Sequence, residues 1–176
     1  ILKYRRKISK KIINQFIKFK GITHPFSSPC SSCSSPCSSV YKDNKSKRTF
    51  YYVCFIYDKR KVNLSLDIFI DALNKEGIPV EKGGYQPLYY QPTYQKKIAF
   101  GNNHFPYISS FNSNIPSYKK GICPIAEKAY EENLFFFPID EVCPSEEEVA
   151  LFSDAISKVI NNAQKISSII NLKKNN

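Results

Sequence analysis

The amino-acid sequence predicts an α+β fold in which helices cover one short sheet. After residue 49, apolar runs typical of strands alternate with apolar stripes at helical spacing. Their order is strand, helix, strand, long loop, helix, strand, helix, which favours an α/β layer and leaves the direction of the strands open. Hydrophobic residues make up 42% of the 176 residues, enough for one packed core.

Residues 3–20 have the pattern of an amphipathic helix, and Gly21 follows where a helix commonly ends. The predicted apolar stripe consists of Tyr4, Ile8, Ile12, Phe16 and Phe19. The opposite face is basic, and residues 1–20 contain no acid. We interpret residues 1–22 as a linking helix that packs on a larger body, with an anion-binding surface as the alternative.

Residues 23–48 form a low-complexity loop rich in Ser, Cys and Pro, which has little apolar surface to bury. The spacing of Cys30, Cys33 and Cys37 could hold zinc or an iron–sulfur cluster, with His24 as the candidate fourth ligand. Metal sites usually bring a second pair of ligands on ordered turns. We therefore favour a mobile linker and predict no metal site.

The core domain is predicted to begin with a buried strand, Phe50–Tyr57, rich in β-branched and aromatic residues. A helix should follow, with Ser65 as its N-cap and Gly77 at its end. The apolar stripe of that helix is Leu66, Phe69, Ile70 and Leu73. A second strand is expected to start at Ile78–Val80.

Residues 83–118 are irregular and rich in Gly, Pro, Asn, Ser and Tyr. A helix over 124–132 and a strand over 134–139 are predicted next. Ser145 and Glu148 match a capping box at the start of the last helix. The domain should extend over residues 49–164, and the Lys- and Asn-rich tail, 165–176, should fray.

The strongest candidate for a binding site is the loop Gly83–Tyr94. It presents Tyr85, Gln86, Tyr89 and Gln91 on a backbone stiffened by prolines. Tyrosine rings and amide groups bind sugars through flat apolar faces and planar hydrogen bonds. The alternative is a Tyr-rich loop that covers a core. His104 is a weaker candidate for a substrate contact, and Glu127 is expected to cap its helix.

The ordered segments together resemble the C-terminal domain of the DegT/DnrJ/EryC1/StrS family of sugar aminotransferases. The likeness covers roughly residues 49–163, and loosely 3–20. It rests on six segments: the strand Tyr51–Asp58, ALNKEGI at 72–78, PLYYQPTY at 87–94, PIAE at 124–127, the strand ending at Phe137-Pro138, and SEEE at 145–148.

The resemblance implies a fold type I transferase that uses pyridoxal 5'-phosphate and acts as a cytoplasmic homodimer. Such enzymes take an amino group from glutamate or glutamine and pass it to a keto sugar, usually nucleotide-linked, or to a keto-cyclitol. The lysine that holds the cofactor would lie in a large N-terminal domain. The chain begins at Ile1 and contains no Met, so we expect a piece of a longer enzyme and name no catalytic or cofactor-binding residue.

The chain departs from the family where many members carry a His-Tyr pair and this one has Gly83-Gly84. A second family histidine is often found where Tyr89 stands. The Gly-Gly-Tyr variant resembles members that act on cyclitols or unusual sugars, so the sequence does not identify the acceptor substrate. The Ser/Cys repeat at 27–39 has no counterpart in the family, as expected for an insertion or a sequence error.

The net charge of +11 supports an alternative function, a non-catalytic basic module for nucleic acid or anionic surfaces. Its basic clusters would be residues 1–20 and 42–61. Two observations argue against this function. Nine acidic residues lie between residues 127 and 154, and a Lys- and Asn-rich composition is also typical of ordinary solvent-exposed faces. We therefore predict neither a nucleic-acid partner nor a membrane partner, since no apolar run approaches the roughly 20 residues of a membrane span.

Overall fold

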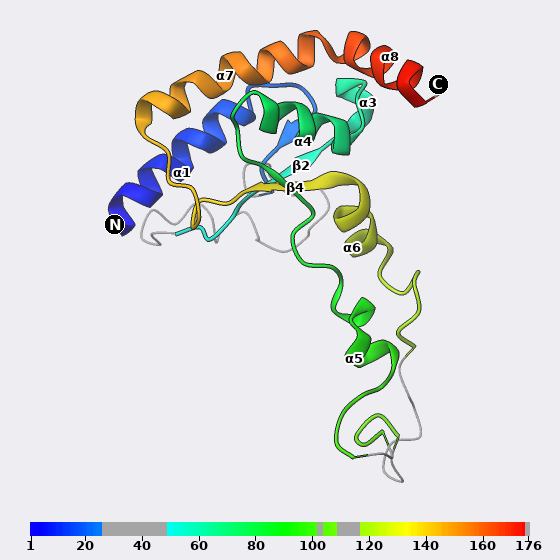
Figure 1. The fold of residues 1–176 in the computed structure, drawn as a ribbon. Helices are drawn as coiled ribbons and strands as arrows, with labels where there is room; N and C mark the ends of the chain where they lie inside the picture. The colour runs from blue at the N-terminus through cyan, green and yellow to red at the C-terminus, as the bar shows by residue number, and fades with distance from the viewer. Residues whose placement is uncertain (26–48, 102–103, 109–116, 175–176) are drawn as a thin grey trace, which may run out of the picture.

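The computed structural model describes residues 1–25, 49–101, 104–108 and 117–174. These residues form a body, in which helices arch over a small sheet, and an arm that extends away from it (Figure 1). We define the arm as the described residues of the segment 83–123. Both ends of the arm leave the body beside helix α6 (Pro124–Lys128). In the described residues, no helix is both long and apolar enough to cross a membrane.

The sheet of the body has four short strands in the order β1-β2-β4-β3. They are β1 (Ile22–Thr23), β2 (Val53–Tyr57), β3 (Glu81–Lys82) and β4 (Leu134–Phe137). All neighbouring strands are antiparallel, and Val53 pairs with Phe137 at the centre of the sheet. This arrangement confirms the predicted α+β class and supplies the strand direction that the sequence left open.

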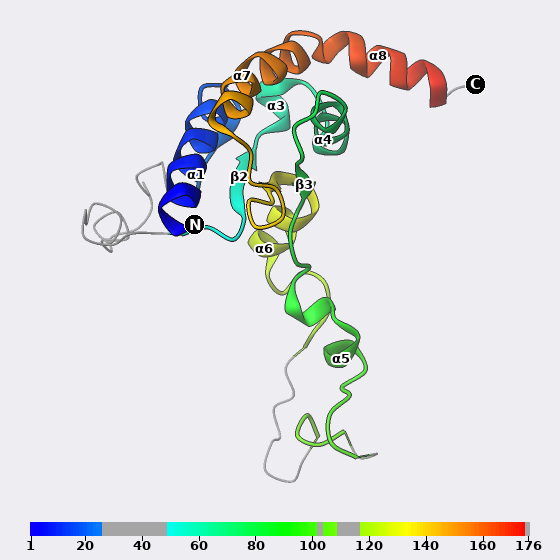
Figure 2. The same ribbon diagram turned by 60° about the vertical axis from the view of Figure 1, so that its left-hand side comes forward.

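The core lies between one face of the sheet and the helices α1 (Leu2–Phe16), α4 (Leu66–Lys75) and α7 (Glu146–Asn161), which lie together in Figure 2. Side chains alternate along a strand, so Val53, Phe55 and Tyr57 all point into this core. The ring of Phe55 stacks on Phe16 of α1 at 4.4 Å. Helix α1 therefore contributes to the same core as the strands.

Local capping explains where two of the helices begin and end. The Ser65 hydroxyl accepts a hydrogen bond from the Ile68 amide at the start of α4. At its end, the Ile78 amide donates to the Leu73 carbonyl across Gly77, which has a φ of +87°. Helix α7 begins with the predicted capping box, in which Ser145 and Glu148 each accept from the other's amide.

Several predicted boundaries were wrong at the N-terminal side. Helix α1 ends at Phe16, because the chain turns toward Gly21 (φ +100°) and enters the unpredicted strand β1. Strand β2 begins at Val53 and is not buried throughout, since Ile56 on its second face is 40% exposed. Strand β3 is Glu81–Lys82, after the buried stretch that we expected to form it. The short helix α3 (Lys59–Val62) was not predicted.

The C-terminal side differs from expectation in three places. Helix α6 is five residues long and continues as a π-helical turn over Ala129–Asn133. Strand β4 ends at Phe137, before the predicted limit. The expected frayed tail is instead helix α8 (Ala163–Lys174). Its start is held by burial of Ala163 and by packing of Ile166 against the core, apolar contacts that the Lys- and Asn-rich composition conceals.

Candidate functional site

The predicted substrate-binding residues lie where the arm leaves the sheet. Gly83 and Gly84 have φ values of +75° and +80°, and the Gly83 amide donates to the Leu134 carbonyl at 2.7 Å. A Cβ on Gly83 would come within 3.0 Å of the Tyr130 ring. The Gly-Gly pair therefore has a structural cause: both residues have a positive φ, and at Gly83 a Cβ would also be crowded by Tyr130.

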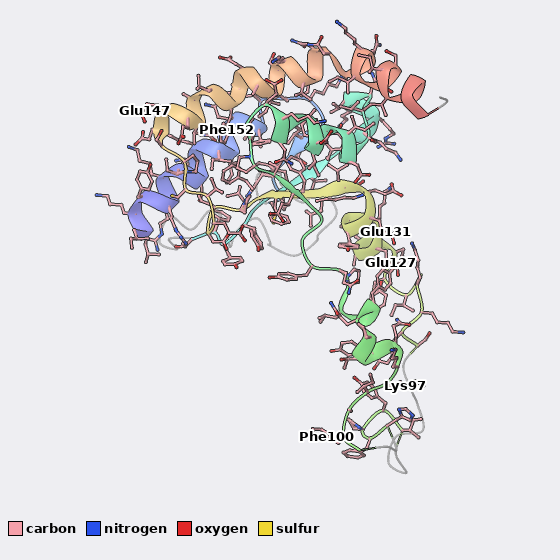
Figure 3. All side chains as sticks on the ribbon, in the orientation of Figure 1. Lys97, Phe100, Glu127, Glu131, Glu147 and Phe152 are labelled. Carbon is pink, nitrogen blue, oxygen red and sulfur yellow. The ribbon has the colours of Figure 1, made fainter. Side chains whose placement is uncertain are left out.

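Tyr89 lies on the short 3-10 helix η1 (Leu88–Tyr90) and is bonded to Glu127 of α6. Its hydroxyl donates to Glu127 Oε1 at 2.5 Å, and the Gly121 amide donates to the same oxygen at 2.7 Å. Glu127 is only 6% exposed. The two chain segments of the arm are thus tied to the body by one buried carboxylate, which Figure 3 shows near the base of the arm.

The Glu127 carboxylate is held in its charged form. The Tyr89 hydrogen bond, followed by the backbone amides of Gly121 and Cys123, lowers the pKa of Glu127. The pKa of Tyr89 is raised, first by burial and then by its bond to Glu127. We expected Glu127 to cap its helix, and it does accept from amides near the helix start. Its bond across the sequence to Tyr89 was not predicted.

Tyr85 lies beside a second polar cluster, formed by Tyr51, Tyr52 and Asp140. The Tyr51 hydroxyl interacts with the Asp140 carboxylate, which raises the pKa of Tyr51. The rings of Tyr51 and Tyr52 are 4.4 Å apart, and Tyr52 packs on Phe136 of β4 at 4.3 Å. The pKa of Tyr52 is raised, first by its hydrogen bond to Tyr51 and only slightly by the nearby Tyr85. The Tyr85 side chain is 82% exposed.

Asp140 gives this cluster an unused hydrogen-bond acceptor. Its Oδ1 atom is buried and has no hydrogen-bond partner in the part of the chain that the structure describes. The backbone carbonyl of Asp140 accepts from Arg5 of α1, which fixes the turn after β4. A buried hydrogen-bond acceptor without a donor lowers stability. Such an acceptor is therefore expected where a ligand or another chain segment supplies the missing donor. The sequence pattern predicts a strand at Tyr51 and Tyr52, and no motif indicates Asp140 as a site residue.

The structure therefore divides the four predicted residues between two places. Tyr85 lies near the Tyr51–Tyr52–Asp140 cluster, whereas Tyr89 belongs to the Glu127 anchor. Gln91 caps helix α5 (Pro92–Gln95) through its backbone carbonyl, which accepts from Tyr94 and Gln95. The side-chain amides of Gln86 and Gln91 have no hydrogen-bond partner among the described residues, so both are available to a ligand.

Other predicted candidates have structural roles or lie outside the described residues. The His24 ring is buried at the edge of the core, 5.8 Å from Phe50 and 6.1 Å from Phe55. The cysteines at 30, 33 and 37 lie outside the described ranges. Within those ranges, no group of three His, Cys, Asp or Glu side chains could hold a metal ion. His104 is exposed, and its Nδ1 lies 3.1 Å from the Lys97 carbonyl.

The described part of the chain does not fit a complete pyridoxal phosphate site. A cofactor lysine must lie in a protected cleft, and no lysine with a described side chain is buried. What the candidate site offers instead is aromatic faces, tyrosine hydroxyls, two unengaged amides and one buried carboxylate oxygen. That set suits a neutral, polyhydroxylated ligand. In comparisons with known proteins, the sequence matches no family model and no curated protein.

Proposed function

We propose that the chain is the acceptor-binding C-terminal part of a sugar aminotransferase that uses pyridoxal 5'-phosphate. The enzyme would transfer an amino group from glutamate or glutamine to a keto sugar or keto-cyclitol, as a cytoplasmic homodimer. The observation that carries the proposal is the exposed Tyr85 beside Tyr51, Tyr52 and the unpaired Asp140 oxygen. The resemblance to the C-terminal domain of the sugar aminotransferases is the second support.

In this proposal the cofactor supplies the electron sink and the chain supplies orientation. Because the described lysines are not buried, the cofactor would be held by a part of the enzyme outside residues 1–176. The Asp140 carboxylate would accept a hydrogen bond from an acceptor hydroxyl. Tyr85 would cover a flat face of the sugar with its ring and would hydrogen-bond a second sugar hydroxyl through its own hydroxyl. The Glu127 anchor would hold the arm in position while the acceptor binds.

The alternative of a basic nucleic-acid module based on residues 1–20 is not favoured. Lys7 and Lys11 of α1 both pair with Glu146 at the start of α7. In the second basic cluster, Arg60 pairs with Asp58. Part of the charge that suggested an anion-binding surface is therefore paired within the body.

The test is a comparison of two tyrosine variants in the full-length enzyme. Tyr85→Phe removes one exposed hydroxyl without removing the ring, and it should raise the acceptor KM by about two- to tenfold, the range of one hydrogen bond. The donor half-reaction with glutamate should keep its rate. Tyr4→Phe on α1, whose hydroxyl bonds to the Pro144 carbonyl, is the matched control and should change neither. Equal losses in both half-reactions for Tyr85→Phe would contradict sugar contact.

A further inference from the structure

Helix α8 leaves the body and opens a space against α4. Helix α7 ends at Asn162, whose side-chain amide donates to the Lys158 carbonyl at 2.8 Å. The chain continues as α8, in which the Ile166 amide donates to the Asn162 carbonyl at 2.9 Å. Ala163 and Ile166 pack on the core, whereas Ile169 is 45% exposed. Figure 2 shows α8 projecting beyond the rest of the body.

The space between α4, α7 and α8, which we name the α8 cavity, has a volume of about 490 Å³. Six apolar side chains line it: Ile68 and Ala72 of α4, Val159 of α7, and Ile166, Ile169 and Ile170 of α8. Val159 is buried and Ile169 is exposed, so the apolar lining extends from the core to the surface. An apolar cavity of this size is typical of sites for small molecules.

The volume of the α8 cavity argues against a helix of a partner protein as its occupant. A helix is about 10 Å across with its side chains and rises about 1.5 Å per residue, so two turns occupy roughly 800 Å³. That volume is well above the 490 Å³ of the cavity. A flexible hydrocarbon chain is much narrower than a helix. The α8 cavity therefore suits an alkyl chain better than a folded peptide.

The charged residues of the α8 cavity favour one kind of head group. Lys75 pairs with Asp71 at 2.7 Å, and Lys158 pairs with Glu76 at 2.8 Å. Lys165 lines the same cavity and has no carboxylate partner among the residues that the structure describes. Three lysines and two carboxylates give the lining a net charge of +1. What distinguishes Lys165 from other exposed lysines is its place beside an apolar cavity, where it matches an alkyl chain that ends in one carboxylate.

We propose that the α8 cavity binds a fatty-acid anion, with the hydrocarbon chain along the apolar lining and the carboxylate at Lys165. Most of the affinity comes from the hydrocarbon, because each buried methylene strengthens binding about fourfold. An exposed ion pair adds only about two- to fivefold. The inference goes beyond the proposed function, because the lining of the α8 cavity shares no residue with the Tyr51–Tyr52–Asp140 cluster or the Glu127 anchor.

The experiment is calorimetric titration of the 176-residue chain with decanoate, octanoate, decylammonium and decanol, each kept below the concentration at which it aggregates. We expect decanoate to bind saturably at one site per chain. Octanoate lacks two methylenes and should bind about tenfold more weakly. Decylammonium should bind at least about twofold more weakly than decanoate, because it meets the positive charge of the lining.

Two exposed side chains of the lining supply the variants. Ile169→Asn places an amide in the apolar lining and should weaken decanoate and decanol alike, about tenfold. Leu151→Asn is its matched control, because Leu151 is also exposed but lies on α7 outside the cavity. Lys165→Ala should weaken decanoate about two- to fivefold and leave decanol unchanged. Lys10→Ala, which removes an exposed lysine of α1, should change neither ligand.

The proposal is overturned by an absence of saturable decanoate binding, by equal binding of decanoate and decylammonium, or by equal effects of Ile169→Asn and Leu151→Asn. Sedimentation that shows a dimer, dissociated by Ile169→Asn but not by decanoate, would also overturn it and assign the cavity to a second copy of the chain. The titration needs no cofactor and no amino transfer, so this proposal and the proposed function can fail separately.

Discussion

Glu127 is the side chain that couples the arm to the body, and its chemistry is set by two donors that bond to one buried carboxylate. The Tyr89 hydroxyl and the Gly121 amide both bond to its Oε1 atom. From the sequence, a glutamate in the first turn of a helix indicates capping, which is a local interaction. The partner Tyr89 is 38 residues away, and no periodicity or motif indicates which tyrosine of the loop it would meet.

This anchor predicts a pH dependence for the arm. Because the pKa of Glu127 is lowered in the folded chain, its stabilising effect is complete above the ordinary glutamate pKa of about 4.3. The effect is lost as the pH falls through the lowered value. Tyr89→Phe removes the largest cause, so the pKa of Glu127 should rise toward its ordinary value, as carboxyl NMR titration can measure. Tyr94→Phe is the control, and an unchanged pKa in Tyr89→Phe would contradict the anchor.

The glycines offer a matched pair of substitutions. Gly77 and Gly83 both have positive φ, but nothing lies within 4 Å of a Cβ added to Gly77, whereas Tyr130 crowds Gly83. Gly77→Ala should cost about 1–2 kcal/mol, the backbone penalty alone. Gly83→Ala should cost at least about 1 kcal/mol more, because it adds a steric clash. Denaturant unfolding measures both changes in the free energy of unfolding. Equal costs would mean that the Tyr130 ring moves aside without loss of stability, which would contradict the predicted clash.

At the scale of elements, helices that begin with a side-chain N-cap could be predicted from the sequence, whereas two-residue strands could not. Ser65, Ser145 and Glu148 act locally, so the helices that they begin could be placed from the sequence. Strands β1 and β3 are two residues each, and β3 is exposed on both residues. They exist because a neighbouring strand supplies their hydrogen bonds, and that tertiary cause leaves no periodic pattern in the sequence.

Helix α7 gives the element-scale prediction. Ile156 is fully buried in the core, whereas Leu151 on the same helix is 65% exposed. Ile156→Ala should lower the free energy of unfolding by about 2–5 kcal/mol, because it leaves a cavity between α7 and the sheet. Leu151→Ala should change it by no more than about 0.5 kcal/mol. Urea unfolding of both variants checks the assignment, which a small cost for Ile156→Ala would overturn.

At the scale of the whole molecule, the chain combines a conventional body with an arm whose composition is different. The α+β fold class of the body could be predicted, because burial of one face of a helix or a sheet gives apolar residues a regular spacing along the sequence. The course of the arm did not, because its residues bury little and are positioned by a few bonds such as Gln95 to Tyr118. The assignment of a binding function to the tyrosine-rich segment stays a prediction.

The central claim is that this chain works as one half of a cofactor enzyme, and absorbance tests it most directly. The full-length protein that contains the chain, incubated with pyridoxal phosphate, should develop a visible band that borohydride removes and that glutamate bleaches. The 176-residue chain alone should develop no such band, because its described lysines are not buried. A borohydride-sensitive band in the isolated chain, or none in the full-length protein, would contradict the account.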